Sequence, residues 1–299
     1  MMPSHGQDSV VVISEIHYNP ASAADDHEFI ELHNLFSVDV DLSNWAISGA
    51  VDFTFPSGTT IAAGGYLVVA RDPAALQAAT GYASALGPWT GALNNGGEKI
   101  KLVMDAIGPR TMNKVDYSDG GSWPTAADGS GASLEKLGAN LPSGRPSSWS
   151  WSQAINGTPG SGRSAVSLPT VVINEIDAVG SGSFFIELYN TGVSGVNLNG
   201  YVIASSDVSR ADVTLSAGVL PASGYLSIDT TTLGYTPLDG ERLYLYTSSK
   251  ALVVDAVVTG NFAKARYPDG TSGFSRPTTV TPALANIVAL NLDVVINEI

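Results

Sequence analysis

One six-residue pattern occurs three times in this chain and determines how the chain divides. The pattern reads VVISEI at residues 11–16, and VVINEI at 171–176 and again at 294–299. Self-similarity at such a distance indicates repeated copies of one folding unit. The segments that follow the first two copies match in the same order: EFIELHN (28–34) with FFIELYN (184–190), VDLSNWAIS (40–48) with VNLNGYVIA (196–204), and IAAGGYLVVA (61–70) with LPASGYLSID (220–229).

These matches predict two complete domains and the start of a third. The Pro/Gly-rich stretch 155–170 has the composition of a linker and separates the two copies. The third copy of the pattern predicts that the sequence continues into a further repeat. The boundaries that we predict are an N-terminal tail at 1–9, a first domain at 10–160, a linker at 161–170, a second domain at 171–287, and a linker with the first strand of a third repeat at 288–299.

The local patterns predict strands almost throughout. Within 28–34, Ile30 and Leu32 alternate with polar or aromatic neighbours, which is typical of a half-buried strand. Each copy contains about seven to nine such runs by our estimate, separated by turns that the 32 glycines and 16 prolines supply. One short helix is predicted, with Asp72 as N-cap, Pro73 in its first turn and Gly81 after its end. The fold class predicted is all-β, as two tandem immunoglobulin-like β-sandwiches.

Composition excludes several classes of function. The formal net charge is −14, and so acidic a surface repels phosphate backbones, which argues against nucleic-acid binding. The chain has no cysteine, which excludes thiolate metal sites, thiol catalysis and disulfides. No apolar run is long enough to span a membrane, so no membrane insertion is expected. The first ten residues lack the basic start and apolar centre of a signal peptide.

Eight short motifs in one order resemble a known family. In the first copy they occupy Ser14–Pro20, Glu28–Asn34, Asp41–Trp45, Phe53–Val69, Leu93–Leu102, Val115–Tyr117, Trp123–Glu135 and Gly157–Gly160. Together they resemble the lamin tail domain as it occurs in secreted bacterial proteins. The second copy carries fewer of them, and its KARYPDGTSGF (264–274) is similar to an alternative ending of the family pattern.

The resemblance implies an immunoglobulin-like sandwich in a large exported bacterial protein, located outside the cell or on its surface. It implies a spacer or adhesion role, or binding to a protein or carbohydrate surface. It transfers no catalytic residue, and fold alone does not fix function. The lamins themselves place this domain after a long coiled coil, and no sustained heptads occur here.

The segment 11–34 nevertheless contains the residue types of a metal site. If its two predicted strands pair, Glu15 and His17 lie near Glu31 and His33, and carboxylates with imidazoles suit zinc, manganese or iron. This arrangement would support the alternative function, a metal-dependent hydrolase. The second copy keeps the glutamates as Glu175 and Glu187 but replaces both histidines. We therefore favour an architectural role for the glutamates, as acceptors for backbone amides or for a tyrosine hydroxyl.

Two further groups are candidates for ligand binding. Asp25, Asp26 and Glu28, which surround His27, could contribute oxygens to calcium, although their spacing does not match an EF-hand. The alternative is a solvated acidic loop. Trp123, with Asp128 near it, could stack on a sugar, as could Trp149 and Trp151, which share one face of a predicted strand. The alternative is that these aromatic residues fill the core.

The favoured function is a non-catalytic tandem of lamin-tail-type domains, with no cofactor expected. The sequence has no nucleophile elbow between a strand and a helix, no phosphate-binding glycine loop and no HExxH motif, and these absences argue against catalysis.

Overall fold

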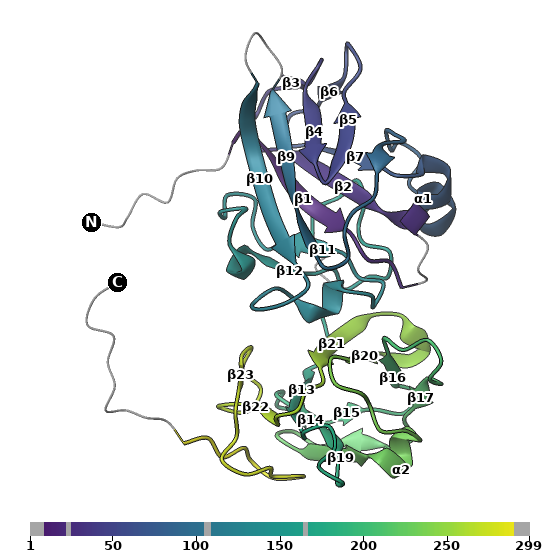
Figure 1. Cartoon of the computed structure of the whole chain (residues 1–299), viewed down its shortest axis with the longest axis vertical. Helices are drawn as coiled ribbons and strands as arrows, with labels where there is room; N and C mark the ends of the chain where they lie inside the picture. The colour runs from purple at the N-terminus through teal and green to yellow at the C-terminus, as the bar shows by residue number, and fades with distance from the viewer. Residues whose placement is uncertain (1–8, 22–24, 105–108, 164–166, 290–299) are drawn as a thin grey trace, which may run out of the picture. The chain divides into compact units, whose positions relative to one another are not determined.

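The computed structural model describes residues 9–21, 25–104, 109–163 and 167–289. The chain divides into two compact units, residues 1–167 (unit 1) and 168–299 (unit 2). Both are built almost entirely of antiparallel strands arranged as immunoglobulin-like sandwiches (Figure 1), which confirms the predicted fold class. In the part of the chain that is described, neither α-helix has the length or the apolar character needed to cross a membrane.

Unit 1 consists of two five-stranded sheets and a small two-stranded one. The first sheet has the order β12-β11-β1-β2-β7, the second β10-β9-β4-β5-β8, and β3 pairs with β6. The elements of unit 1 are β1 (Val11–His17), η1 (Asp25–His27), β2 (Phe29–Asn34), β3 (Val40–Asp41), β4 (Ala46–Gly49), β5 (Val51–Thr54), β6 (Thr60–Ile61), β7 (Tyr66–Ala70), α1 (Pro73–Thr80), β8 (Thr90–Gly91), β9 (Gly97–Met104), β10 (Arg110–Ser118), η2 (Thr125–Ala127), β11 (Leu134–Lys136), η3 (Pro146–Ser148) and β12 (Trp149–Trp151).

Unit 2 repeats this plan with fewer residues. Its sheets have the orders β19-β14-β13-β22-β23 and β17-β16-β20-β21, and β15 pairs with β18. Its elements are β13 (Val171–Ile176), β14 (Phe185–Asn190), β15 (Val196–Asn197), β16 (Val202–Ser205), β17 (Val213–Thr214), β18 (Val219–Leu220), β19 (Tyr225–Asp229), α2 (Thr230–Leu233), β20 (Arg242–Tyr246), η4 (Ser248–Lys250), β21 (Val253–Val258), β22 (Lys264–Arg266) and β23 (Phe274–Ser275).

The core of each unit lies between its two larger sheets. In unit 1, Ile30 and Leu32 of β2 belong to the same buried cluster as Ile100 and Leu102 of β9. β9 alternates between its two faces, since Lys99, next to Ile100 in the chain, is exposed. The described residues contain more strands per unit than the seven to nine expected. The excess consists of two-residue pairings, such as β3 with β6, which are too short to leave a periodic pattern in the sequence.

The prediction that β2 is buried on one face is wrong. Phe29, Ile30, Glu31 and Leu32 are all buried, so both faces are covered. Phe29 packs with Val68, Ala70 and Leu76, the last of which comes from α1. The helix therefore covers part of the outer face of the first sheet, where the periodicity of the strand alone predicts solvent.

The single predicted helix, α1, is confirmed at both ends. The Asp72 carboxylate accepts hydrogen bonds from the backbone N–H groups of Ala74 (2.9 Å) and Ala75 (3.1 Å). Gly81 follows the helix with a φ of 80°, a left-handed conformation that glycine adopts without steric cost. Leu76 is the buried residue by which the helix is attached to the sheet.

We expect Asp72→Ala to lower the free energy of unfolding of unit 1 by about 1 kcal/mol, because two backbone N–H groups lose their acceptor. All five tryptophans (Trp45, Trp89, Trp123, Trp149 and Trp151) belong to unit 1, so tryptophan fluorescence during urea unfolding measures this unit alone. Asp52→Ala, at an exposed strand position, is the control. An equal effect of the two substitutions would contradict the capping role.

The two units tie their sheets together with different chemistry at one position. In unit 1, the backbone N–H of Ile13 donates to the amide oxygen of buried Asn113 (3.1 Å). In unit 2, the backbone N–H of Ile173 donates to the Asp255 carboxylate (2.9 Å), which also forms a 2.8 Å ion pair with Arg266. A neutral amide and a buried ion pair thus serve the same connection.

The two ends of the predicted linker each contact residues of the unit to which they belong. Arg163, in the predicted linker 161–170, lies 3.5 Å from Glu135 of unit 1, while Thr170 accepts a hydrogen bond from Thr191 of unit 2. The domain boundaries given above stay predictions. The terminal VVINEI at 294–299 lies outside the described residues.

Candidate functional site

Three buried glutamates meet on the outer face of the first sheet of unit 1. The strand register places Glu15 of β1 directly opposite Glu31 of β2 and, on its other side, opposite Glu135 of β11. Their exposed fractions are 1%, 1% and 4%. We call Glu15, Glu31 and Glu135 the carboxylate cluster. Carboxyl groups that are buried this closely together need either hydrogen-bond donors that stabilise their ionised form or protonation.

The partners come from the end of the unit. Residues 158–160, which we call the closing segment, cover the cluster. The backbone N–H of Thr158 donates to Oε1 of Glu15 (2.9 Å), and the Thr158 hydroxyl lies within hydrogen-bond distance of Oε2 of Glu15 (3.1 Å) and of Glu135 (3.2 Å). The backbone N–H of Gly160 donates to Oε2 of Glu31 (2.7 Å). The cluster therefore holds the last residues of the unit against its first strand.

Side chains of the sheet complete the arrangement. The Ser133 hydroxyl donates to Glu15, and the Ser14 hydroxyl donates to Glu31 (2.7 Å). Ser14 sits at an irregularity in the register of β1 and β2, where the pairing shifts between Ile13 and Glu15. A bulge of this kind re-aims a side chain, here towards the cluster.

The chemistry of the cluster depends on its protons. Burial raises the pKa of the Glu135 carboxyl to about 7. Burial also raises the pKa values of Glu15 and Glu31, and the closeness of the other carboxylates adds to the increase. The cluster therefore retains protons at a pH at which an exposed glutamate is ionised.

Unit 2 contains the same device. Glu175 and Glu187 face each other across β13 and β14, next to the same register shift. Oε2 of Glu175 accepts from the backbone N–H of Thr281 (2.9 Å), and Oε2 of Glu187 accepts from the backbone N–H of Ala283 (2.6 Å). Asn174 replaces Ser14 and donates to Glu187 (3.1 Å).

One member of the cluster is absent from unit 2. Ala265 lies opposite Glu175, where Glu135 lies opposite Glu15. The two paired glutamates are therefore the shared part of the architecture, together with the closing segment of each unit, which in unit 2 is residues 281–283. Sequence comparison found these glutamates but missed Glu135 as their neighbour. The alignment of LEK in β11 with KAR in β22 could have revealed the position but not the contact.

The histidines do not join the cluster. His17 lies opposite Phe29 and His33 opposite Val12, on either side of the glutamate pair. His17 is fully buried, its Nδ1 lies 3.1 Å from the His27 carbonyl oxygen, and burial lowers its pKa to about 4. His33 stacks on Tyr66 with ring centroids 4.2 Å apart. The pairing of the two strands was predicted correctly, but it separates the residues that the hydrolase hypothesis needs together.

The acidic loop is organised around an arginine. Asp25 lies in η1 with its Oδ2 3.1 Å from Arg71, and the buried Glu28 lies 3.6 Å from the same Arg71 nitrogen. Glu28 also accepts from the backbone N–H of Leu93 (3.1 Å). Asp26 is exposed. Across the residues that the structure describes, no three His, Asp or Glu side chains are grouped so as to hold a metal ion.

The aromatic candidates belong largely to the core. Trp149 is only 3% exposed, and its indole N–H donates to the Ser143 carbonyl oxygen (2.9 Å). Trp123 and Trp151 are half-buried and pack against the same core cluster. Asp128 is buried and accepts from the Asn19 amide (2.6 Å). These residues offer no continuous exposed platform for a sugar.

Comparison with known families agrees with the repeat. The family model described as Lamin Tail Domain matches residues 5–119 and 164–261. The two matches begin before β1 and β13 and include both glutamate pairs, but each ends before the closing segment of its unit. No curated protein matches the chain.

Proposed function

The chain belongs to the lamin tail domain family, and from this membership we propose that its two units are non-catalytic modules of an exported bacterial multidomain protein. They act as spacers or adhesion elements, or bind a protein or carbohydrate surface. No cofactor is required, although calcium binding at the acidic loop is included in the test below.

One observation carries the proposal. The side chains that resemble a catalytic centre are buried and occupied by internal contacts. Glu15 and Glu31 accept hydrogen bonds from the closing segment, and the same contacts recur in unit 2. A catalytic carboxylate must reach a substrate, whereas these carboxylates hold one part of the fold to another.

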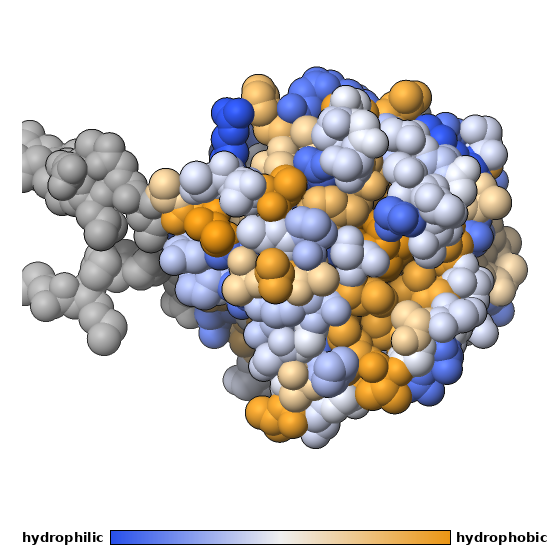
Figure 2. Space-filling view, turned by 90° about the horizontal axis from the view of Figure 1, so that it is seen from below, coloured by the Kyte–Doolittle hydropathy of each residue, from blue (hydrophilic) through white to orange (hydrophobic). Residues whose placement is uncertain are grey.

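Surface composition supports a contact role. Val193 and Val208 are exposed to 97% and 93%, and Leu284 to 65%, all in loops of unit 2. Figure 2 shows apolar residues, coloured orange, gathered in several groups among polar ones on the face that it draws. Exposed apolar groups favour association with partner surfaces. The acidic charge argues against nucleic acid as that partner.

The test is metal analysis combined with thermal unfolding. After dialysis we expect no stoichiometric transition metal or calcium, and a melting temperature that EDTA changes by less than about 1 °C, because a bound ion stabilises the folded state by mass action. Assays with phosphoester, peptide and glycoside substrates, run with added Zn²⁺ or Mn²⁺, should show no turnover. Stoichiometric metal with a large EDTA-induced fall in melting temperature would contradict the proposal for unit 1.

A further inference from the structure

Unit 2 has a longer loop than unit 1 at one point of the shared plan. In unit 1, the last pairing before the β4–β5 turn is Ile47 with Phe53, and in unit 2 the last before the β16–β17 turn is Ile203 with Val213. The loop of unit 2 therefore spans residues 204–212, against 48–52 in unit 1. The larger loop carries Arg210, and the short turn of unit 1 contains no arginine or lysine.

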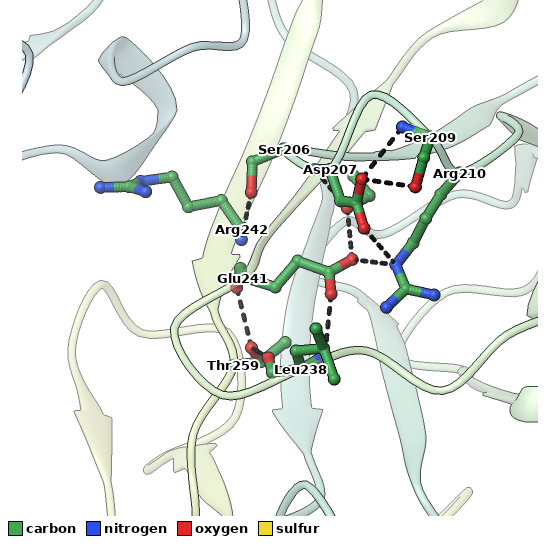
Figure 3. Close-up of polar contacts among 9 residues, drawn as sticks. Ser206, Asp207, Ser209, Arg210, Leu238, Glu241, Arg242 and Thr259 are labelled. Atoms are coloured by element: carbon green, nitrogen blue, oxygen red, sulfur yellow. Dashed lines mark hydrogen bonds and ion pairs between the residues drawn. The ribbon is translucent and has the colours of Figure 1, made fainter.

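The loop holds Arg210 in a fixed orientation (Figure 3). Its Nε lies 2.8 Å from Glu241 and 3.5 Å from Asp207. Glu241 is itself buried and accepts hydrogen bonds from the Ser205 hydroxyl and from the backbone N–H of Leu238 (2.7 Å). The guanidinium carbon of Arg210 lies 4.6 Å from the centre of the Tyr235 ring. Ion pairing and stacking together remove most of the freedom of this side chain.

Two side chains have hydrogen-bond donors that remain for another molecule. The ion pairs of Arg210 use Nε, and in Figure 3 its two terminal nitrogens point away from Glu241. The Tyr235 hydroxyl is buried and has no hydrogen-bond partner in the described part of the chain. Burial raises the pKa of Tyr235 to about 12, so this hydroxyl keeps its proton at neutral pH. Unsatisfied polar groups of this kind call for an explanation.

Both side chains line a hollow of about 540 Å³, within the usual range for small-ligand pockets. Asp212, Thr214 and Thr232 contribute further polar groups to its wall, and Leu233 an apolar surface. Donors, acceptors and a small apolar patch thus surround one space.

The local charges select the class of ligand. Arg210 is neutralised by Glu241 and Asp207, and Asp212 lies 2.6 Å from Lys250. No excess positive charge remains to attract an anion, and the chain as a whole is acidic. A ligand with many hydroxyl groups can accept from the guanidinium and donate to the Asp212 carboxylate without a net charge of its own.

We propose that this hollow of unit 2 binds one sugar residue of a neutral polysaccharide, with neighbouring hydroxyls on the terminal nitrogens of Arg210 and a further oxygen on the Tyr235 hydroxyl. This inference rests on the proposed binding role and assigns it a site and a ligand class. Unit 1 lacks the loop and does not share the site.

The test uses the intact chain and calorimetric titration with soluble neutral oligosaccharides of glucose, galactose, mannose and N-acetylglucosamine, and with an oligoglucuronate as the acidic comparison. We expect binding to at least one neutral oligosaccharide and none to the oligoglucuronate. Tyr235→Phe, which removes only the hydroxyl, and Arg210→Lys, which removes the planar fork, should each weaken binding about tenfold.

Arg276→Ala is the matched control, because Arg276 is exposed and also stacks on an aromatic ring of unit 2, that of Phe262 at 4.3 Å. The affinity of the Arg276→Ala variant for the neutral oligosaccharide should equal that of the unchanged chain. Binding to none of the neutral oligosaccharides, binding to the oligoglucuronate alone, or binding that Tyr235→Phe leaves intact would each overturn the inference. The metal and turnover assays are independent of this titration, so each of the two proposals can be contradicted without the other.

Discussion

Replacing Glu15 by alanine is expected to lower the free energy of unfolding of unit 1 by on the order of 3 kcal/mol. The substitution removes the acceptor of the half-buried Thr158 backbone N–H and of the buried Ser133 hydroxyl, and leaves both without that partner. For a unit of this size the melting temperature should fall by roughly 8–10 °C. Tryptophan fluorescence measures this transition without interference from unit 2.

The repeat provides the matched experiment. Glu175→Ala removes the equivalent contacts to Thr281 and should destabilise unit 2 while leaving the tryptophan transition unchanged. Hydrogen exchange of the Thr158 amide should accelerate in Glu15→Ala, because the closing segment loses its attachment. If Glu15→Ala were no more destabilising than Asp52→Ala, the carboxylate cluster would not hold the unit together.

The second large effect is a loss of stability as the pH rises. Burial raises the pKa values of Glu15 and Glu31, and raises that of Glu28 and of Glu135 to about 7. Below the unfolded value of 4.5 these groups carry a proton in both states. Between 4.5 and the folded pKa only the folded state retains it. The free energy of unfolding of unit 1 should therefore fall by on the order of 3 kcal/mol between pH 5.5 and 8.5.

One group opposes this trend. Burial lowers the pKa of His17 to about 4. Its contribution to the free energy of unfolding is therefore fully present above the ordinary histidine pKa of 6.5 and is lost as the pH falls. Four raised carboxyl groups outweigh this single histidine across the measured range. Urea titrations at intervals of pH, followed by tryptophan fluorescence, give the slope.

Glu31→Gln supplies the control for the pH experiment. Glutamine keeps the volume but cannot ionise, so the fall in stability with pH should become shallower. Unit 2 should show a smaller fall, because Ala265 stands where the third carboxyl group of unit 1 lies. A wild-type stability that rises from pH 5.5 to 8.5 would show that the cluster is ionised in the folded state.

The sequence predicted the features that local chemistry determines. The ends of α1 depend on local preferences: the side chain of Asp72 caps the start, Pro73 favours the first turn, and Gly81 favours the end. The helix begins and ends where these residues predict. The interpretation of the glutamates as part of the architecture followed from the repeat, since two copies kept the same glutamates while the residues around them changed.

Contacts between distant segments were not predictable in this way. The full burial of β2 depends on α1 and on the closing segment, and Thr158 is 143 residues away from Glu15. The place of Glu135 in the cluster depends on strand order, which no local pattern encodes. The Arg210 hollow was missed because its parts, Tyr235 and the 204–212 loop, are joined only through the fold.

The order in which the chain is synthesised gives the carboxylate cluster a further consequence. Glu15 leaves the ribosome first, and its backbone donor at Thr158 follows only after nearly the whole of the unit has been made. Until then the carboxyl groups are open to water and ionised, and their mutual repulsion works against compaction of β1, β2 and β11. When Thr158 and Gly160 arrive, the same groups accept hydrogen bonds from them and become buried, and burial raises their pKa values. The final residues of each repeat therefore complete its own fold, before the next repeat forms the equivalent contacts between its glutamates and its closing segment.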